Sequence, residues 1–166
     1  MMNSLDVEAA YLRLRDALAA ALPAARDGVC VVGVHSGGVW VADRLRHDLG
    51  LKGPSGSLSS AFHRDDYGQR GLPADIKSTE LAFEVEGADI LLVDDILFTG
   101  RTVRAALNEI FDYGRPARVR LAVLIDRGGR ELPVAADFCG VQHPLPADRA
   151  FVLSRDAEGR FALIVE

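Results

Sequence analysis

The sequence has few of the residues that build disulfide frameworks or zinc sites. Only two of its 166 residues are cysteines, Cys30 and Cys139, and both lie in apolar surroundings without a paired spacing. Disulfide frameworks and zinc ribbons require several cysteines at fixed intervals. We therefore expect both thiols to be small buried side chains. We also expect no metal site built from protein side chains alone.

Signals for a membrane or for secretion are also missing. No apolar run is long enough to cross a bilayer. The N-terminus lacks the charged, apolar and small-residue segments that make up a signal peptide. These absences predict a cytoplasmic protein with no membrane partner.

Positive charge is not in excess. Lysine and arginine together number 19 against 24 acidic residues, which gives a net charge of −5 and a pI of about 5.4. Neutralising phosphates requires a local excess of cations, so this balance argues against a constitutive, sequence-blind nucleic-acid binder. Several arginines lie close together in the second half of the chain: Arg115, Arg118, Arg120, Arg127 and Arg130. They could form a basic patch on one face of the protein, although a solvated surface is the simpler interpretation of these arginines.

The rest of the composition is that of an ordinary globular domain. Hydrophobic residues make up 49% of the chain and charged residues 26%, which is enough to bury the core of one domain. No internal repeat is visible. Residues 6–22 carry an apolar residue at steps of three and four, which predicts an amphipathic helix. Its apolar face comprises Val7, Tyr11, Leu14, Leu18 and Leu22.

Apolar runs and helix-like segments then alternate along the chain. We predict strands at 28–34, within 55–63, at 90–93 and at 118–126, and helices at 39–49 and 100–113. This alternation predicts an α/β fold with a mostly parallel, twisted sheet flanked by helices. The polar stretch 64–80 reads as a long surface loop.

The stretch 88–107, ADILLVDDILFTGRTVRAAL, has the most distinctive chemistry. Its apolar strand runs into Asp94 and Asp95, whose like charges repel unless a ligand compensates them. The Thr-Gly-Arg-Thr sequence that follows opens a helix, where backbone N–H groups and hydroxyls form an anion cradle. An anion with adjacent hydroxyl groups describes a ribose 5-phosphate. Ligands of parallel sheets bind beyond the carboxyl ends of the strands, where we also expect Asp126 and the His-Ser-Gly-Gly loop.

Residues 90–102 resemble the phosphoribosyl-pyrophosphate signature of type I phosphoribosyltransferases. Residues 114–140, GRPARVRLAVLIDRGGRELPVAADFCG, are similar to the segment that follows this signature in the PyrR family of pyrimidine operon regulators with uracil phosphoribosyltransferase activity. The Arg-Asp-Asp of 64–66 also matches. The resemblance implies a type I phosphoribosyltransferase fold with a small C-terminal hood, as a single domain over residues 1–166.

The resemblance also assigns roles to the matching positions. Asp94 and Asp95 would hold the ribose hydroxyls of phosphoribosyl pyrophosphate, and Arg64, in a loop that closes over the reaction centre, would join them in catalysis. The 5-phosphate would be held by Thr99, Gly100, Arg101 and Thr102. The pyrophosphate loop would comprise His35, Ser36, Gly37 and Gly38. Mg²⁺, bound with phosphoribosyl pyrophosphate, would neutralise the departing pyrophosphate.

The chain departs from the better-known family pattern at two places. The pyrophosphate loop often has Thr-Arg-Gly where this chain has 36–38, and a histidine is common where this chain has Gly129. The first difference removes a cation near pyrophosphate, and the second removes an RNA or nucleotide contact.

The resemblance suggests that a hood binds the base. Phe151 and Val152 would stack on it, with Arg127 and Phe98 nearby; the alternative is an ordinary strand with its apolar face in the core. In the related purine salvage enzymes, an aspartate stands where this chain has Phe98 and exchanges a proton with the purine. A phenyl ring cannot accept a proton, so we expect a pyrimidine base. The alternative is that Phe98 only packs beneath its loop.

Two functions follow from the resemblance. The first is a uracil phosphoribosyltransferase that makes UMP and pyrophosphate. The second is a regulator that binds pyrimidine-operon mRNA and senses UMP or UTP in the same pocket. Arginines gathered on one exposed face would favour RNA binding, and arginines dispersed among acids would favour the enzyme; the relevant residues are Arg13, Arg15, Arg115, Arg118 and Arg130. We also expect a homodimer or a dimer of dimers.

Overall fold

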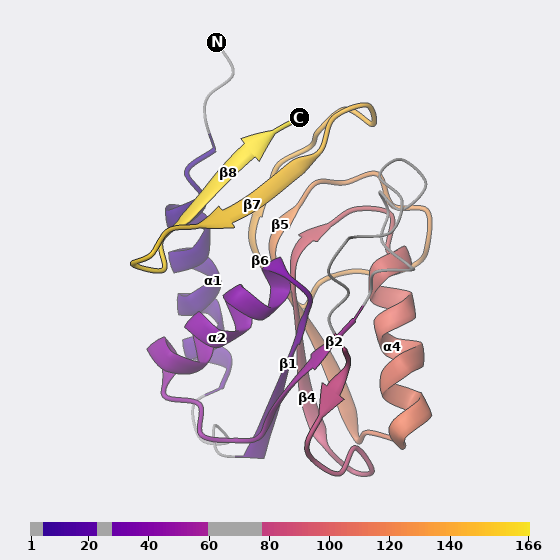
Figure 1. Cartoon of the computed structure of the whole chain (residues 1–166). Coiled ribbons are helices and arrows are strands. Elements are labelled where there is room, and N and C mark those ends of the chain that lie inside the picture. Colours follow the sequence, from indigo (N-terminus) through magenta and orange to yellow (C-terminus); the bar gives the residue numbers. More distant parts are fainter. Residues whose placement is uncertain (1–4, 23–27, 60–77) are drawn as a thin grey trace.

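The structure is a computed structural model that describes residues 5–22, 28–59 and 78–166 (Figure 1). In chain order its elements are α1 (Val7–Ala21), β1 (Val29–Val34), α2 (Gly37–Leu49), β2 (Ser55–Leu58), β3 (Glu80–Leu81), β4 (Asp89–Leu97), α4 (Arg101–Tyr113), β5 (Arg118–Asp126), β6 (Phe138–Gln142), β7 (Phe151–Arg155) and β8 (Phe161–Val165). Arg64 and most of the loop 64–80 lie outside the described residues.

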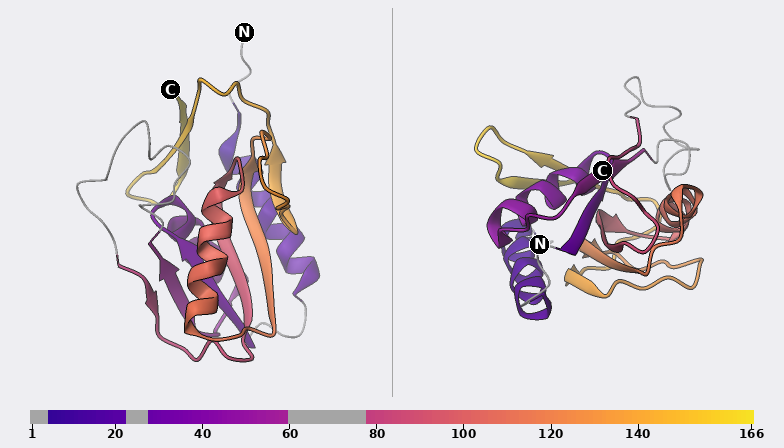
Figure 2. Two further views of the ribbon diagram at one scale, coloured as in Figure 1. Left: turned by 90° about the vertical axis from the view of Figure 1, so that its right-hand side faces the viewer. Right: turned by 90° about the horizontal axis from the view of Figure 1, so that it is seen from below.

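Six strands form one sheet in the order β3-β2-β1-β4-β5-β6. β3 is antiparallel to β2, and the other neighbours are parallel. The helices cover both faces: α1 and α2 lie on one side and α4 on the other (Figure 2). The predicted α/β class and mostly parallel sheet are confirmed.

Side chains of the central strands alternate between two apolar clusters. Val29 and Val31 of β1 pack with α1 and α2, whereas Cys30 and Val32 pack with α4. Because both faces of the sheet are covered, every residue of β1 is buried. This explains why the strand reads as a continuous apolar run rather than an alternating one.

Helix α1 matches its predicted apolar face. The carboxylate of Asp6 caps the helix by accepting a 3.0 Å hydrogen bond from the N–H of Ala9. All five residues of the predicted face are buried: Val7, Tyr11, Leu14, Leu18 and Leu22.

Two predicted boundaries were wrong. β4 does not stop at Val93 but continues to Leu97, so the paired acids lie in the strand and not in a loop. The reason is that pairing with β5 continues after β1 has made its last pair, Gly33 with Val93. Helix α2 begins two residues earlier than predicted, at Gly37.

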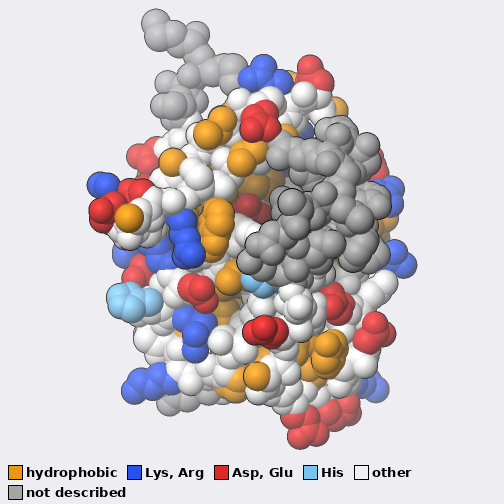
Figure 3. Space-filling model, viewed as in Figure 1, with side chains coloured by type: hydrophobic (Ala, Val, Ile, Leu, Met, Phe, Trp, Pro, Cys, Tyr) orange, Lys and Arg blue, Asp and Glu red, His pale blue; other side chains and the backbone are white. Residues whose placement is uncertain are grey.

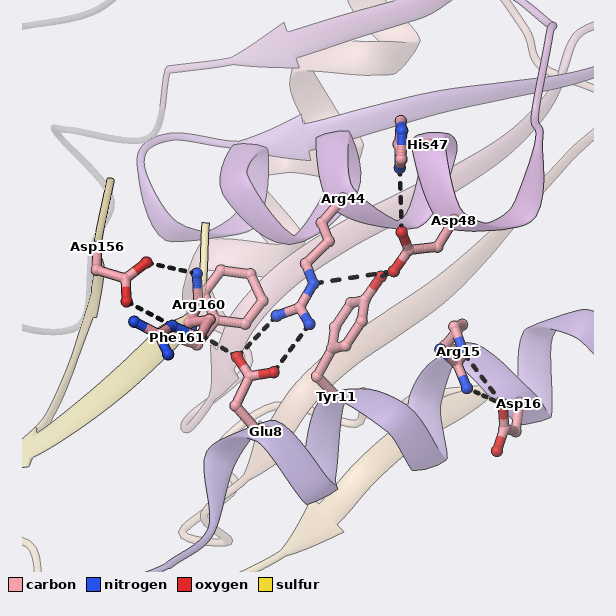
Figure 4. A network of polar contacts seen from close by, with 10 residues as sticks. All are labelled: Glu8, Tyr11, Arg15, Asp16, Arg44, His47, Asp48, Asp156, Arg160 and Phe161. Carbon is pink, nitrogen blue, oxygen red and sulfur yellow. Dashed lines mark hydrogen bonds and ion pairs between the residues drawn. The ribbon is translucent and has the colours of Figure 1, made fainter. Parts of the chain in front are cut away.

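Strands β7 and β8 form a separate antiparallel hairpin. Figure 4 shows how it joins the helices. The Phe161 N–H donates a 2.6 Å hydrogen bond to Glu8 Oε1, and Arg44 of α2 forms two hydrogen bonds of 2.7 and 2.8 Å with the same carboxylate. Tyr11 completes the contact by donating a 2.6 Å hydrogen bond to Asp48. The hairpin is therefore held by the helical layer.

None of the helices in the described residues combines the length and the apolar character needed to cross a membrane.

Candidate functional site

The predicted site begins where β1 ends beside β4. After Val34 the chain turns through His35 and Ser36 into α2, while β4 runs on past the end of β1. Gly37 and Gly38, the first two residues of α2, lie in contact with the paired acids. A Cβ atom at Gly37 would be 2.1 Å from Asp95 Oδ2, and one at Gly38 would be 2.6 Å from the Val93 carbonyl oxygen. The structure therefore brings together two segments about sixty residues apart in sequence, and only glycine fits between them.

The two carboxylates are oriented by the backbone that follows them. Asp94 Oδ1 accepts a 2.9 Å hydrogen bond from the Asp95 N–H, and Asp95 Oδ1 accepts a 2.9 Å hydrogen bond from the Ile96 N–H. Asp94 is 5% exposed, and Asp95 is partly exposed. Both acids thus have a fixed direction at the end of a buried strand.

The short loop between β4 and α4 has the form of an anion cradle. Gly100 adopts φ +96° and caps a helix of 13 residues, whose N-terminal N–H groups and dipole favour an anion. Thr99 is buried, and its hydroxyl accepts a 3.2 Å hydrogen bond from the Arg101 N–H. The guanidinium of Arg101 pairs at 2.8 Å with Glu131, and both side chains are more than half exposed. Thr102 lies in the first turn of the helix, partly buried.

Asp126, which we expected at the same end of the sheet, lies there but is already paired. Its carboxylate oxygens contact Arg130 Nη2 at 2.7 and 2.8 Å, and one of them accepts a 3.0 Å hydrogen bond from the Gly128 N–H. The pair places Arg130 against the loop after β4, where Arg130 also donates to the Phe98 carbonyl oxygen. From the sequence, Arg130 was expected only in a basic patch. The Asp-x-x-x-Arg spacing at the end of a strand is the one signal that could have revealed the pair.

Phe98 and Arg127, both predicted near the base, stack on each other. The guanidinium carbon of Arg127 lies 3.7 Å from the centre of the Phe98 ring. A Cβ atom at Gly129 would lie 2.5 Å from Phe98 Cε2, so the space available to a side chain at 129 is taken by this ring. Arg127 also donates hydrogen bonds of 2.9, 3.2 and 2.9 Å to the carbonyl oxygens of Arg149, Leu145 and Pro146. Arg127 therefore supports the chain that leads into β7.

Phe151 and Val152, the hairpin residues predicted to stack on the base, differ from each other in burial. Phe151 is 9% exposed and belongs to the apolar cluster beneath α1 and α2, and its ring lies 5.8 Å from that of His143. Val152, the next residue, is partly buried. Phe151 thus occupies the packing position that the alternative described, and contact of either residue with a base stays a prediction.

Three of the five arginines proposed for RNA binding form ion pairs with acids. Arg15 pairs with Asp16 at 3.0 Å, Arg118 with Asp89 at 2.6 Å and Arg130 with Asp126 at 2.7 Å, while Arg13 donates to the Gly140 carbonyl oxygen. On the face drawn in Figure 3, acidic and basic side chains are interspersed. By the criterion given above, this distribution favours the enzyme.

Sequence reasoning missed the contact between the hairpin and the helices. Glu8, Tyr11 and Arg44 come from two helices, and no motif links them. The hydrogen bonds from Arg44 hold the pKa of Glu8 below its ordinary value. Burial, with a further contribution from the hydrogen bond to Asp48, raises the pKa of Tyr11. Within residues 5–22, 28–59 and 78–166, no group of three or more His, Cys, Asp or Glu is placed to hold a metal ion.

Comparison with known proteins gives one consistent result. Residues 5–153 match the phosphoribosyl transferase domain. The chain is 51% identical over 161 residues to a protein of Ralstonia nicotianae called "Bifunctional protein PyrR", covering 96% of this chain and 92% of that protein. A protein of the same name from Pseudomonas putida is 47% identical over 126 residues, which are 76% of this chain and 73% of the relative.

Solved structures show the same fold. A hypoxanthine-guanine phosphoribosyltransferase from Bacillus anthracis superposes with a TM-score of 0.63 at 20% identity, over 87% of this chain and 83% of that one. A purine phosphoribosyltransferase from Pyrococcus horikoshii gives 0.59 at 24% identity, over 81% and 82%. Identities this low show the fold alone.

Proposed function

Since this chain belongs to the phosphoribosyl transferase domain family and, within it, to the PyrR family, we propose that it transfers phosphoribose from phosphoribosyl pyrophosphate to uracil and makes UMP and pyrophosphate. The observation that carries the proposal is the contact of Gly37 and Gly38 with Asp95 and Val93. The segment 35–38, to which we assign pyrophosphate, lies directly against the acids to which we assign ribose. One ligand that carries both groups would therefore span the two segments.

The proposed reaction is a substitution at the anomeric carbon of ribose. The N1 atom of uracil gives up its proton to water and forms the new bond to ribose as the bond to pyrophosphate breaks, through a transition state with oxocarbenium character. Asp94 and Asp95 would accept hydrogen bonds from the ribose hydroxyls, and the loop 99–102 would hold the 5-phosphate. Catalysis is then mainly positioning and charge stabilisation, and no protein nucleophile is required.

The described residues suit a metal ion that arrives with the substrate. They contain no ligand cluster of their own, but Asp94 and Asp95 provide carboxylate oxygens, which Mg²⁺ prefers, next to the turn assigned to pyrophosphate. When bound there, Mg²⁺ would neutralise charge on the leaving pyrophosphate. The protein contributes by holding each of the two carboxylates in a fixed orientation through hydrogen bonds from the N–H groups of Asp95 and Ile96.

The preference for a pyrimidine rests on Phe98. A purine whose imidazole nitrogen faced this ring would lose a hydrogen bond and a proton acceptor, at a cost of about 1–3 kcal/mol before any effect on the chemical step. The test is an assay of uracil, orotate, hypoxanthine and guanine with phosphoribosyl pyrophosphate and Mg²⁺. We expect turnover with uracil. Comparable turnover of either purine would refute the pyrimidine preference, and preferred use of orotate would refute uracil.

A second function is supported by the name of the relatives, which calls them bifunctional. We propose that the same chain also binds pyrimidine-operon mRNA and senses UMP or UTP in its pocket. The experiment is a titration of pyrimidine-leader RNA with and without UMP. Binding that UMP does not change, or no binding, would leave the enzyme as the function.

We further propose self-association as a homodimer or a dimer of dimers. Several large apolar side chains on the described surface are at least 40% exposed: Leu12, Phe111, Tyr113 and Ile164. Such residues favour an interface between copies of the chain. Light scattering at micromolar concentration tests this, and a monomer would contradict it.

A further inference from the structure

The loop between β4 and α4 is held on one side by a single segment. This segment, residues 127–132, donates hydrogen bonds to three successive carbonyl groups, and we call it the bracing segment. The Leu97 carbonyl oxygen accepts from the Arg127 N–H at 3.0 Å, the Phe98 oxygen accepts from Arg130 Nη1, and the Thr99 oxygen accepts from the N–H groups of Glu131 and Leu132 at 2.9 and 3.0 Å.

This arrangement fixes the direction of the loop amides. In a trans peptide the C=O of one residue and the N–H of the next point in opposite directions. The one cis peptide bond in the described residues joins His35 to Ser36, so the bonds of this loop are trans. With the carbonyls of 97–99 turned toward the bracing segment, the N–H groups of 98–100 are directed away from it. Those amides precede the N-terminus of α4, where an anion is favoured.

One of the four donors of the bracing segment is a side-chain group, the guanidinium of Arg130. Arg130 reaches the Phe98 carbonyl oxygen with Nη1 while Nη2 is held by both carboxylate oxygens of Asp126. The side chains of Arg130 and Asp126 are only 24% and 14% exposed, so water competes weakly for either. Asp126 is the last residue of β5 and therefore has a fixed position. The chain of contacts runs from the sheet through Asp126 and Arg130 to the Phe98–Thr99 peptide.

We propose that Arg130 is a positioning residue for the 5-phosphate of phosphoribosyl pyrophosphate and that Asp126 holds it in place. By fixing the Phe98 carbonyl, Arg130 sets the direction of the Thr99 N–H in the loop assigned to the phosphate. Arg130 touches no substrate in this account. The inference rests on the proposed function. It adds a residue outside the signature stretch 90–102 to those that determine how the 5-phosphate is bound.

The test compares two ligands, each of which contains one part of phosphoribosyl pyrophosphate. Ribose 5-phosphate contains the 5-phosphate, and inorganic pyrophosphate does not. Calorimetric titration of the whole protein should show that Arg130→Gln weakens ribose 5-phosphate binding about tenfold or more, because misdirected donors lose much of their hydrogen bonding. Pyrophosphate binding should change less than twofold. In the assay, KM for phosphoribosyl pyrophosphate should rise while KM for uracil stays the same.

Two further variants separate positioning from folding. Arg130→Lys keeps a charged donor between Asp126 and Phe98 and should recover most of the affinity. Since Arg130→Gln leaves the mostly buried carboxylate of Asp126 without its cation, the double variant Asp126→Asn with Arg130→Gln removes that charge and should show the same loss of ribose 5-phosphate binding in a folded protein. The control is Arg160→Gln, which removes an exposed ion pair with Asp156 in the turn between β7 and β8 and should leave both ligands unaffected.

The outcomes distinguish this inference from the proposed function. If the wild-type protein binds ribose 5-phosphate and the folded double variant binds it equally well, the role of Arg130 is wrong while the enzyme assignment stands. Equal losses for ribose 5-phosphate and pyrophosphate would also overturn it, because they would show a general disturbance of the site. A wild-type protein that binds neither ligand would overturn both the proposed function and this inference.

Discussion

Gly37 lies against the carboxylate of Asp95, so closely that a Cβ atom on residue 37 would stand 2.1 Å from Oδ2 and 2.7 Å from Cγ. The backbone of Gly37 is not in the left-handed region. Glycine is therefore needed here for space and not for conformation. The contact joins the start of α2 to the end of β4 and fixes how near a pyrophosphate group could come to the paired acids.

Replacing Gly37 by alanine should disable the site while the fold remains. The methyl group must displace Asp95 or the turn, and we expect kcat/KM for phosphoribosyl pyrophosphate to fall about 100-fold, because small displacements of reacting groups cost that much. Overpacking should also lower the free energy of unfolding by about 1–3 kcal/mol. Steady-state kinetics and urea unfolding measure the two effects. Gly28→Ala is the control, because nothing lies within 4 Å of a Cβ atom there; equal kinetics for the two variants would refute the role of the contact.

The paired acids should be needed for the substrate and not for the fold. In the double variant Asp94→Asn with Asp95→Asn, the side-chain oxygens can still accept the hydrogen bonds from the N–H groups of Asp95 and Ile96. Repulsion between the two charges disappears, so we expect stability equal to or above that of the wild type, and no measurable binding of phosphoribosyl pyrophosphate. Thermal unfolding and calorimetry check this. A variant that unfolds, or that binds normally, would show that the acids are structural.

Gly128 and Gly129 offer a matched pair of substitutions. Both have positive φ, +72° and +78°, but only a Cβ atom at 129 meets a neighbour, Phe98 Cε2 at 2.5 Å. Gly128→Ala should cost about 1–2 kcal/mol for the left-handed backbone alone. Gly129→Ala should cost about 1–3 kcal/mol more because of the ring. Urea unfolding measures the difference, which should shrink when Phe98→Ala is added; no change in that cycle would mean that the ring is not the obstacle.

The link between hairpin and helices should weaken in acid. Because the hydrogen bonds from Arg44 lower the pKa of Glu8, the ionised carboxylate stabilises the folded state. This contribution is complete above about pH 5, where the unfolded carboxylate is ionised, and is lost as the pH falls through the lowered pKa of the folded state.

Glu8→Gln tests this prediction. The variant should be less stable than the wild type by about 1 kcal/mol at pH 7, a modest value because the side chain is one-third exposed. The difference should shrink steadily as the pH is lowered from about 5 through the lowered pKa of the folded state. Thermal unfolding across this pH range gives the comparison, with Asp16→Asn as the control, since the side chain of Asp16 is 69% exposed where it pairs with Arg15. A difference that shows no decrease at all as the pH falls below 5 would show that the charge of Glu8 is not its source.

Periodicity and local motifs predicted the parts of this fold that depend on nearby residues. Every residue predicted for the apolar face of α1 is buried, because a single helix face records its burial at steps of three and four; only Ala10, which is also buried in this helix, was not predicted. The end of β4 was not predicted, because its length depends on β5, whose pairing continues beside Asp94, Ile96 and Leu97 after β1 has left. A strand ends where its last partner ends, and the partner lies about thirty residues away in sequence.

The candidate site likewise combines residues that a local motif identifies with contacts from distant parts of the chain. Asp94, Asp95 and the Thr-Gly-Arg-Thr sequence lie within nine residues of one another, so a single motif identifies them. The contacts that hold them come from farther along the chain: Arg130 reaches a backbone carbonyl, which no pattern of side chains records, and the space at Gly129 is filled by a ring from another loop. The residues assigned to chemistry were therefore visible in the sequence, and the residues that support them were not.

The separate pairing of β7 with β8 has a consequence for how such a chain can evolve. In the described residues the hairpin shares no ladder with the six-stranded sheet. Its attachments are side chains: Phe151, Leu153 and Phe161 in the apolar cluster, and Glu8 on the Phe161 N–H. Insertions or deletions within the hairpin can therefore accumulate without shifting any register of β4 or β5. The C-terminal part of the chain can diversify as a module while the strands that carry Asp94 and Asp95 stay unaltered.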